Sequence, residues 1–136
     1  MADADHVTGL ATRAAFESYL VERLPQPGLA VLLVDVVGLK RVNEEQGFLT
    51  GDSHLCAAAQ RLQRAAAQAA LVARLGGDEL VAVFAGPDAA TQARDAACGL
   101  DGRAGEPIVR AALAVTTAVD TRETLINRLY ATVRRS

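Results

Sequence analysis

The amino-acid sequence predicts an α/β (α+β) fold in which a mixed, partly antiparallel central sheet is surrounded by helices. Predicted helices alternate with a few short strands, and two of these strands flank a Gly-Gly pair, which is the pattern of a β-hairpin. The chain has 136 residues, close to the commonest size of a single domain. We therefore expect one hydrophobic core and one domain over residues 1–136.

The N-terminal half predicts helices on either side of one strand. Apolar residues recur at helical spacing over residues 12–24, with Thr12 as a candidate N-cap. The continuous apolar run from Leu29 to Val36 is typical of a central strand covered on both faces. A short helix over Gly38 to Gln46 and a longer one over Gly51 to Gln68 should follow.

The C-terminal half predicts a hairpin and then two more helices around a last strand. Gly76-Gly77 should form a tight turn between strands at 71–75 and 79–85, because glycine adopts positive φ without a steric penalty. The remaining elements expected are a helix from Pro87 at position N1 to Cys98, a loop with Gly99, Gly102 and Gly105, a strand over Ile108 to Val119, and a helix over Thr121 to Arg134 that begins with a capping box of Asp120 and Glu123.

Composition and charge exclude several classes of function. The net charge is -2 and the basic residues are scattered, so no basic stripe is available for nucleic acid. The longest apolar stretch, Leu29 to Val34, is far too short to span a bilayer, and the N-terminus does not resemble a signal peptide. Cys56 and Cys98 lack CxxC spacing, so we expect reduced thiols in a cytoplasmic domain without a membrane segment.

Several familiar kinds of catalytic or nucleotide site are absent from the sequence. Neither a P-loop motif nor a GxGxxG motif after a strand is present. His6 and His54 lack the spacing of metal ligands, and no serine lies in a nucleophile elbow. Nucleophilic serine chemistry and zinc chemistry are therefore disfavoured.

Carboxylates lie at two informative places. Asp35 ends the apolar strand, and Asp78 with Glu79 follows the Gly-Gly turn. If this strand lies beside the hairpin, the three acids converge at one edge of the sheet and form an oxygen-rich site suited to Mg²⁺ and substrate phosphates. The residues alone leave two alternatives open: Asp78 and Glu79 as polar turn residues, and Asp35 as a helix N-cap.

Three sequence blocks resemble a known family. Asp5 to Phe16 (DHVTGLATRAAF) resembles the DxLTGLxNRxxF opening of GGDEF domains, the diguanylate cyclase family. Val34 to Asn43 (VDVVGLKRVN), followed by Gly51-Asp52, resembles that family's DxDxFKxIN block and its trailing GHxxGD. Arg74 to Leu80 (RLGGDEL) is similar to the signature RxGGDEF. On these blocks the chain is identified as a member of the family over residues 5 to 85.

The resemblance implies a reaction and the residues that carry it. Each domain of a homodimer would present one GTP, and two GTP would condense into cyclic di-GMP with Mg²⁺ or Mn²⁺ as cofactor. The implied metal ligands are Asp35, the main-chain carbonyl of Val36, Asp78 and Glu79. Asp78 and Glu79 are also the implied catalytic residues, with the division between base and ligand left open.

The resemblance also implies the residues that bind GTP. Asn43 and Asp52 would contact the guanine edge, and Gly76 and Gly77 would let the nucleotide approach the main chain. Lys40, the single lysine of the chain, falls at the family's lysine position and would contact the phosphates.

The chain departs from the family pattern at several positions. Val133 occupies the place of a phosphate-binding lysine in the last helix, where Arg134 or Arg135 is a candidate replacement. Ala67 and Ala70 occupy the places of the inhibitory RxxD motif, so product inhibition through that site is not expected. The remaining departures are Val37, Gly38, Phe48 and Leu80.

Two functions are therefore carried forward. The first is an active diguanylate cyclase of bacterial second-messenger signalling, favoured by Asp35, Asn43, Asp52 and the Gly-Gly-Asp-Glu core. The second is a degenerate GGDEF module that binds GTP or serves as a regulatory or dimerisation domain without turnover. An attached sensor or phosphodiesterase domain is an expected partner in either case.

Overall fold

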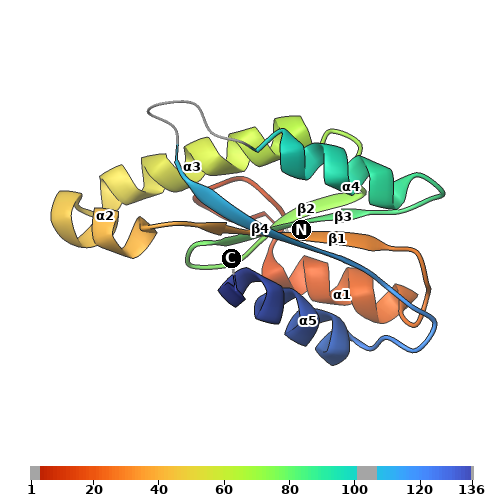
Figure 1. The fold of residues 1–136 in the computed structure, drawn as a ribbon. Coiled ribbons are helices and arrows are strands. Elements are labelled where there is room, and N and C mark those ends of the chain that lie inside the picture. Colours follow the sequence, from red (N-terminus) through yellow and green to blue (C-terminus); the bar gives the residue numbers. More distant parts are fainter. Residues whose placement is uncertain (1–3, 101–106, 136) are drawn as a thin grey trace.

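Four strands form one sheet with helices on both of its faces, as seen in the computed structural model, which describes residues 4–100 and 107–135 and the side chains up to residue 133 (Figure 1). The strand order is β2-β3-β1-β4. The elements are α1 (Arg13–Arg23), β1 (Ala30–Val36), α2 (Leu39–Gln46), α3 (Phe48–Ala65), β2 (Leu71–Gly76), β3 (Glu79–Phe84), α4 (Ala89–Cys98), β4 (Val109–Val115) and α5 (Arg122–Arg135).

The ladders between these strands are antiparallel. β1 is paired with β3 on one side and with β4 on the other, and β2 is paired with β3. A single parallel bridge joins Ala11, just before α1, to Ala73 in β2. The predicted α/β fold, with a central sheet surrounded by helices, is confirmed, and the hairpin lies beside the strand that ends in Asp35.

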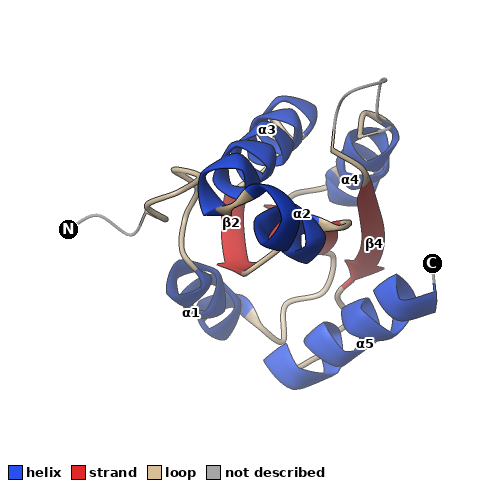
Figure 2. Ribbon diagram, turned by 90° about the vertical axis from the view of Figure 1, so that its left-hand side faces the viewer, coloured by secondary structure: helices blue, strands red, loops and turns tan. Residues whose placement is uncertain are grey.

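The sheet separates two hydrophobic layers. Figure 2 shows α3 and α4 on one side of the strands and α1 and α5 on the other, with α2 at the end of the sheet. Leu32 and Val34 in β1 pack toward α3 and α4, whereas Val31 and Leu33 pack toward α1 and α5. The predicted coverage of β1 on both faces is confirmed. Because side chains alternate along a strand, Asp35 lies on the α1 and α5 face.

Four predicted boundaries are wrong by a few residues. The helix α3 ends at Ala65, three residues before the predicted Gln68. α3 begins at Phe48 instead of Gly51, because Gly47 at φ +89° lets α2 end and α3 begin without a longer loop. α4 begins at Ala89, so Pro87 precedes the helix. β4 ends at Val115, four residues before the predicted end. The predicted loop residues Gly102 and Gly105 lie outside the described residues.

The hairpin turn also differs in detail from its prediction. β2 continues through Gly76 and β3 starts at Glu79, so the two turn residues are Gly77 and Asp78. Gly77 has φ +39°, which a residue with a side chain rarely adopts. A glycine at position 77 therefore allows Asp78 to lie within the turn itself.

The predicted capping box of Asp120 and Glu123 is wrong, because neighbouring groups take both roles. The main-chain N–H of Thr124 donates to Thr121 Oγ1 (3.2 Å), and the N–H of Thr121 donates to Thr124 Oγ1 (3.0 Å). Asp120 is buried and instead accepts from the Thr117 N–H (2.8 Å) and from Arg128 Nη1 (3.0 Å). The buried carboxylate thus ties the start of α5 to the loop that precedes it.

We predict that Asp120→Asn lowers the free energy of unfolding at pH 7 by about 2 kcal/mol, the usual contribution of hydrogen bonds to a charged group. The hydrogen bond from Arg128 holds the Asp120 pKa well below its usual range. A lowered pKa contributes stability above the unfolded value, and this contribution should disappear as the pH falls below about 4. Urea denaturation measures both effects. Asp88→Asn is the control, because Asp88 is exposed and makes no capping hydrogen bond. Equal stability of the two variants would contradict the role of Asp120.

Candidate functional site

The pairing of β1 with β3 brings the three predicted carboxylates together. Asp35 lies opposite Glu79 in the antiparallel register. The main-chain N–H of Val36 donates to the carbonyl oxygen of Asp78 (2.8 Å). The Asp78 carboxylate also lies close enough to Asp35 to raise the pKa of Asp35. The convergence expected at one edge of the sheet is therefore present, at the end of β1 that leads into α2.

This crowding of carboxylates changes the acidity of Asp35. Partial burial and the negative charges of Asp78 and Glu79 together raise the pKa of Asp35 from 3.8 to about 6. The positive charge of Arg110, which lies opposite Asp35 in β4, lowers the pKa of Asp35 and offsets part of this rise. The site is thus a concentration of negative charge that a cation or a proton stabilises.

Glu79 has a partner that the sequence did not predict. The hydroxyl of Tyr130 in α5 donates to Glu79 Oε1 at 2.9 Å. The two residues are 51 positions apart, and no spacing rule connects a helical tyrosine to a hairpin glutamate. Tyr130 fixes one carboxylate oxygen and leaves the other available.

A cavity of about 390 Å³ opens between α2, the start of α3 and the hairpin turn. Five of the predicted site residues line it, together with four residues that were not predicted as site residues. Its lining comprises Leu39, Lys40, Asn43, Phe48, Asp52, Leu55, Arg74, Gly77 and Asp78. The other predicted site residues, Asp35, Val36, Gly76 and Glu79, do not line it and lie on the strand ends next to Asp78.

Two buried polar atoms of the cavity-lining residues lack a hydrogen-bond partner. They are Oδ1 of Asn43 and Nε of Arg74. Buried polar atoms in proteins are nearly always paired, so these two atoms mark the packing beside the cavity as incompletely satisfied by protein groups. The Asn43 amide can occupy this position only because residue 51 is a glycine. A Cβ atom at residue 51 would lie 1.5 Å from Asn43 Oδ1 and would clash with it. Gly51 is therefore needed for the observed position of Asn43.

Arg74 holds the edge of the cavity together. Its Nη1 atom lies 3.2 Å from Oδ1 of Asp5, and its Nη2 atom donates to the carbonyl oxygen of Gly77 (2.9 Å). Asp5 also accepts from the main-chain N–H and the hydroxyl of Thr8, both at 2.8 Å. The block that begins at Asp5 and the block that begins at Arg74 thus meet in the fold. The sequence predicted the motif that contains Arg74 but did not predict that its side chain would support the cavity.

The donor set suits a hard cation that is bound together with a ligand. Within the described ranges, no group of three or more Asp, Glu, His or Cys side chains is arranged to hold a metal ion by itself. Mg²⁺ commonly binds through one or two carboxylates and completes its shell with substrate phosphates and water. Asp35 near the end of β1 and Asp78 in the adjoining hairpin turn provide such a pair of carboxylates.

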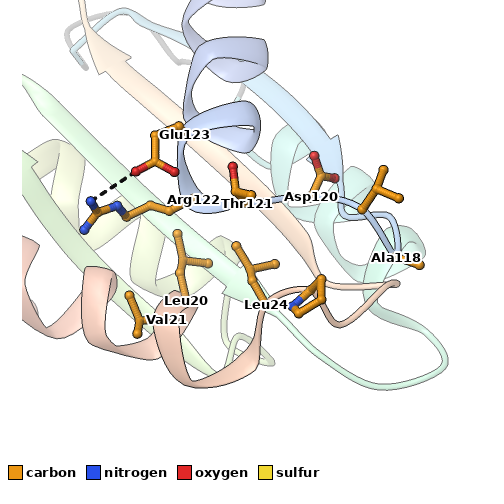
Figure 3. Close-up of a pocket in the computed structure, with 10 residues that line it drawn as sticks. Leu20, Val21, Leu24, Ala118, Asp120, Thr121, Arg122 and Glu123 are labelled. Carbon is orange, nitrogen blue, oxygen red and sulfur yellow. Dashed lines mark hydrogen bonds and ion pairs between the residues drawn. The ribbon is translucent and has the colours of Figure 1, made fainter.

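A second cavity, of about 450 Å³, lies between the end of α1 and the segment 118–123 (Figure 3). Leu20, Val21 and Leu24 make much of its wall. Its charged groups are already paired: Arg122 lies 3.3 Å from Glu123, and the Asp120 carboxylate is occupied by the contacts given above. This cavity therefore offers less for a polar ligand than the one at the hairpin turn.

The family model described as "Diguanylate cyclase, GGDEF domain" matches residues 2–121. The chain belongs to the GGDEF domain family. The Mycobacterium tuberculosis protein Rv1354c is 41% identical over 97 residues, which is 69% of this chain and 16% of that protein. The cyclic di-GMP phosphodiesterase NbdA of Pseudomonas aeruginosa is 37% identical over 84 residues, 58% of this chain and 11% of that protein. The chain thus spans a small fraction of these relatives.

A solved structure of similar fold extends over nearly the whole domain. The sensory box/GGDEF family protein from Caulobacter crescentus is 29% identical, with a TM-score of 0.75 that covers 98% of this chain and 97% of that one. The described helices include none with the length and apolar character needed to cross a membrane.

The residues that depart from the family pattern lie at different depths in the fold. Val133, at the place of the expected lysine, is 7% exposed and packs in the core layer of α1 and α5. The side chains of Arg134 and Arg135, the candidate replacements, lie outside the described residues. Ala67 and Ala70, at the places of the inhibitory motif, are exposed.

We predict that Asp35→Asn changes the pH dependence of stability in metal-free buffer. Because the folded-state pKa of Asp35 is raised to about 6, the folded protein binds this proton more tightly than the unfolded chain. The free energy of unfolding of the wild type should therefore fall as the pH rises from about 4 to about 6. With allowance for solvent screening, the variant should be more stable above pH 6 by on the order of 1 kcal/mol.

Urea denaturation across this pH range, in the presence of EDTA, measures the difference. Asp95→Asn on the exposed side of α4 is the control and should follow the wild type. A variant that is less stable than the wild type above pH 6 would show that the Asp35 carboxylate is not held in a repulsive environment.

Proposed function

We propose that this domain is a diguanylate cyclase that condenses two GTP molecules into cyclic di-GMP for bacterial second-messenger signalling. The observation that carries the proposal is the single cavity that combines Asn43 and Asp52, Lys40, and Asp78 with its partner Asp35. A nucleotidyl transfer on GTP requires three kinds of group: side chains that hydrogen-bond the guanine base, a positively charged side chain that binds the phosphates, and a pair of carboxylates that binds a metal ion.

Guanine matches the polar groups at one end of the cavity. Its N1–H and exocyclic amine are donors that a carboxylate at Asp52 would accept, and the amide of Asn43, which lines the same cavity, would provide a further hydrogen-bonding group. Adenine presents an acceptor at N1 and would leave these groups unpaired. A site that hydrogen-bonds a polar edge discriminates strongly against an analogue with mismatched donors. We therefore expect GTP to be preferred over ATP.

The reacting groups would lie beside the hairpin turn, where Asp78 lines the cavity. The 3′-hydroxyl of one GTP would attack the α-phosphorus of the other, breaking its bond to pyrophosphate and releasing the hydroxyl proton to Asp78 or Glu79. Lys40 would contact the phosphates, while Gly76 and Gly77 would let them approach the main chain. Asp35, the Val36 carbonyl, Asp78 and Glu79 would hold Mg²⁺ or Mn²⁺, which neutralises the charge that develops on the phosphate.

The reaction requires a second copy of the domain. Each domain has one such cavity with Asn43 and Asp52 in its lining and one group of carboxylates beside it, so one domain would hold one GTP. Two such domains facing each other would bring each 3′-hydroxyl to the opposite α-phosphate, and the reaction would yield cyclic di-GMP and two pyrophosphates. We infer that activity depends on a homodimer.

The second candidate is a module that binds GTP and regulates an attached domain without turnover. The burial of Val133 favours it, because the last helix then presents no lysine to the phosphates at that position. The similarity to NbdA, a phosphodiesterase by name, agrees with such a role. In this case the cavity would bind Mg²⁺ and GTP, but no product would form.

Incubation with GTP and Mg²⁺, followed by chromatography for cyclic di-GMP, tests the proposed activity. The wild type should form product, and Asp35→Asn should reduce the rate by about 100-fold or more, because a preorganised charge at the reacting phosphate is lost. Absence of product from the wild type, combined with a Mg²⁺-dependent rise of the melting temperature by GTP, would favour the regulatory module. Absence of both would contradict both nucleotide functions.

We also predict that Gly51→Ala weakens GTP binding without unfolding the domain. The new Cβ would occupy the position of Asn43 Oδ1, so the flexible amide must move while α3 gains a better helix former. Calorimetric titration measures the dissociation constant, and Asn43→Ala provides the comparison. Because both changes remove the same contact, the double variant should bind no more weakly than Asn43→Ala alone. Additive losses would show that Gly51 acts by another route.

A further inference from the structure

We infer that the ring of Phe48 stacks on the guanine base in the cavity between α2, α3 and the hairpin turn, an inference that rests on the proposed function. Three phenylalanines are present in the chain. Phe16 and Phe84 are each 1% exposed, whereas Phe48 is 74% exposed. A large aromatic side chain left in solvent loses the free energy that burial would provide. Its position beside a polar cavity therefore calls for a function.

The position of Phe48 relative to the base-reading residues supports stacking. Phe48 and Asp52 are one helical turn apart on α3, so their side chains lie next to each other on one face of the helix. Both residues line the cavity, together with Asn43 of α2. The hydrogen-bonding edge and the aromatic ring are therefore neighbours.

A guanine base that is hydrogen-bonded along its edge still has two exposed apolar faces, and the ring of Phe48 could cover one of them. Hydrogen bonds that guanine donates to Asp52 and forms with the Asn43 amide would fix the edge of the base in its plane but leave its two faces to be covered. An aromatic ring covers one face by offset stacking, which is independent of base identity. Phe48 would thus increase the affinity for purine nucleotides in general, while Asp52 selects guanine among them.

The neighbouring Leu49 provides a matched control. Leu49 is 86% exposed on the same first turn of α3, yet it is not among the residues that line the cavity. If exposure alone reflected a contact between two copies of the domain, Phe48 and Leu49 would both contribute. If the base is the partner, only Phe48 matters.

The test uses 3′-deoxy-GTP with Mg²⁺, because this analogue lacks the attacking hydroxyl and so is not consumed. Calorimetry of the wild type, Phe48→Ala, Phe48→Trp and Leu49→Ala gives the dissociation constants. NMR detects whether the Phe48 ring protons lie close to guanine H8 in the complex. Sedimentation of each variant reports the fraction of dimer.

Stacking predicts that Phe48→Ala weakens binding by about fivefold to 100-fold, that Phe48→Trp retains it, and that Leu49→Ala stays within about twofold of the wild type. A ring contact to H8 should accompany binding. Unchanged affinity in Phe48→Ala, or absence of the H8 contact, would overturn the inference while leaving the proposed function intact. Equal losses of binding and of dimer in Phe48→Ala and Leu49→Ala would also overturn it, in favour of a contact between copies. If the wild type does not bind the nucleotide, the proposed function itself fails.

Discussion

The antiparallel register of β1 with β3 is the constraint on which the candidate site depends. It sets Asp35 opposite Glu79 and joins Val36 to the carbonyl of Asp78, so like charges are brought together by main-chain pairing. Because β1 is covered on both faces, a slip by one residue would turn its apolar side chains onto the wrong layers. The hydrophobic core thus stabilises an arrangement of carboxylates that electrostatics alone would disfavour, and the raised pKa of Asp35 is the measurable result.

The helical pair α2 and α3 adds the second half of the site. Gly47 joins the two helices directly, and Gly51 leaves room for the Asn43 amide against α3. Arg74 then links the hairpin turn to the N-terminal segment through Gly77 and Asp5. Two segments that are distant in the sequence, residues 39–55 and 74–78, therefore line one cavity, and the N-terminal segment supports it through Asp5. Five of the residues that line this cavity carry polar or charged side chains, namely Lys40, Asn43, Asp52, Arg74 and Asp78.

Much of this arrangement was predictable from the sequence, because its determinants are local. Apolar periodicity and the Gly-Gly pair predicted the helices, the central strand and the hairpin, and the strand-end position of Asp35 predicted its convergence with Asp78 and Glu79. Contacts across long sequence separations were not predictable, such as the hydrogen bond from Tyr130 to Glu79 or that from Arg74 to Asp5. The cap of α5 was predicted wrongly because Asp120 and Thr121 are both good N-cap residues, and tertiary pairing with Arg128 decided between them.

Proton release on nucleotide binding tests the central claim most directly, namely that Asp35 belongs to a carboxylate pair that binds a cation with GTP. Calorimetry of 3′-deoxy-GTP and Mg²⁺ in buffers of different ionisation enthalpy gives the number of protons released. With a pKa of about 6, Asp35 should release about half a proton at pH 6 that Asp35→Asn does not release, and the difference should vanish at pH 8. Equal proton release by the two proteins at pH 6 would contradict the claim.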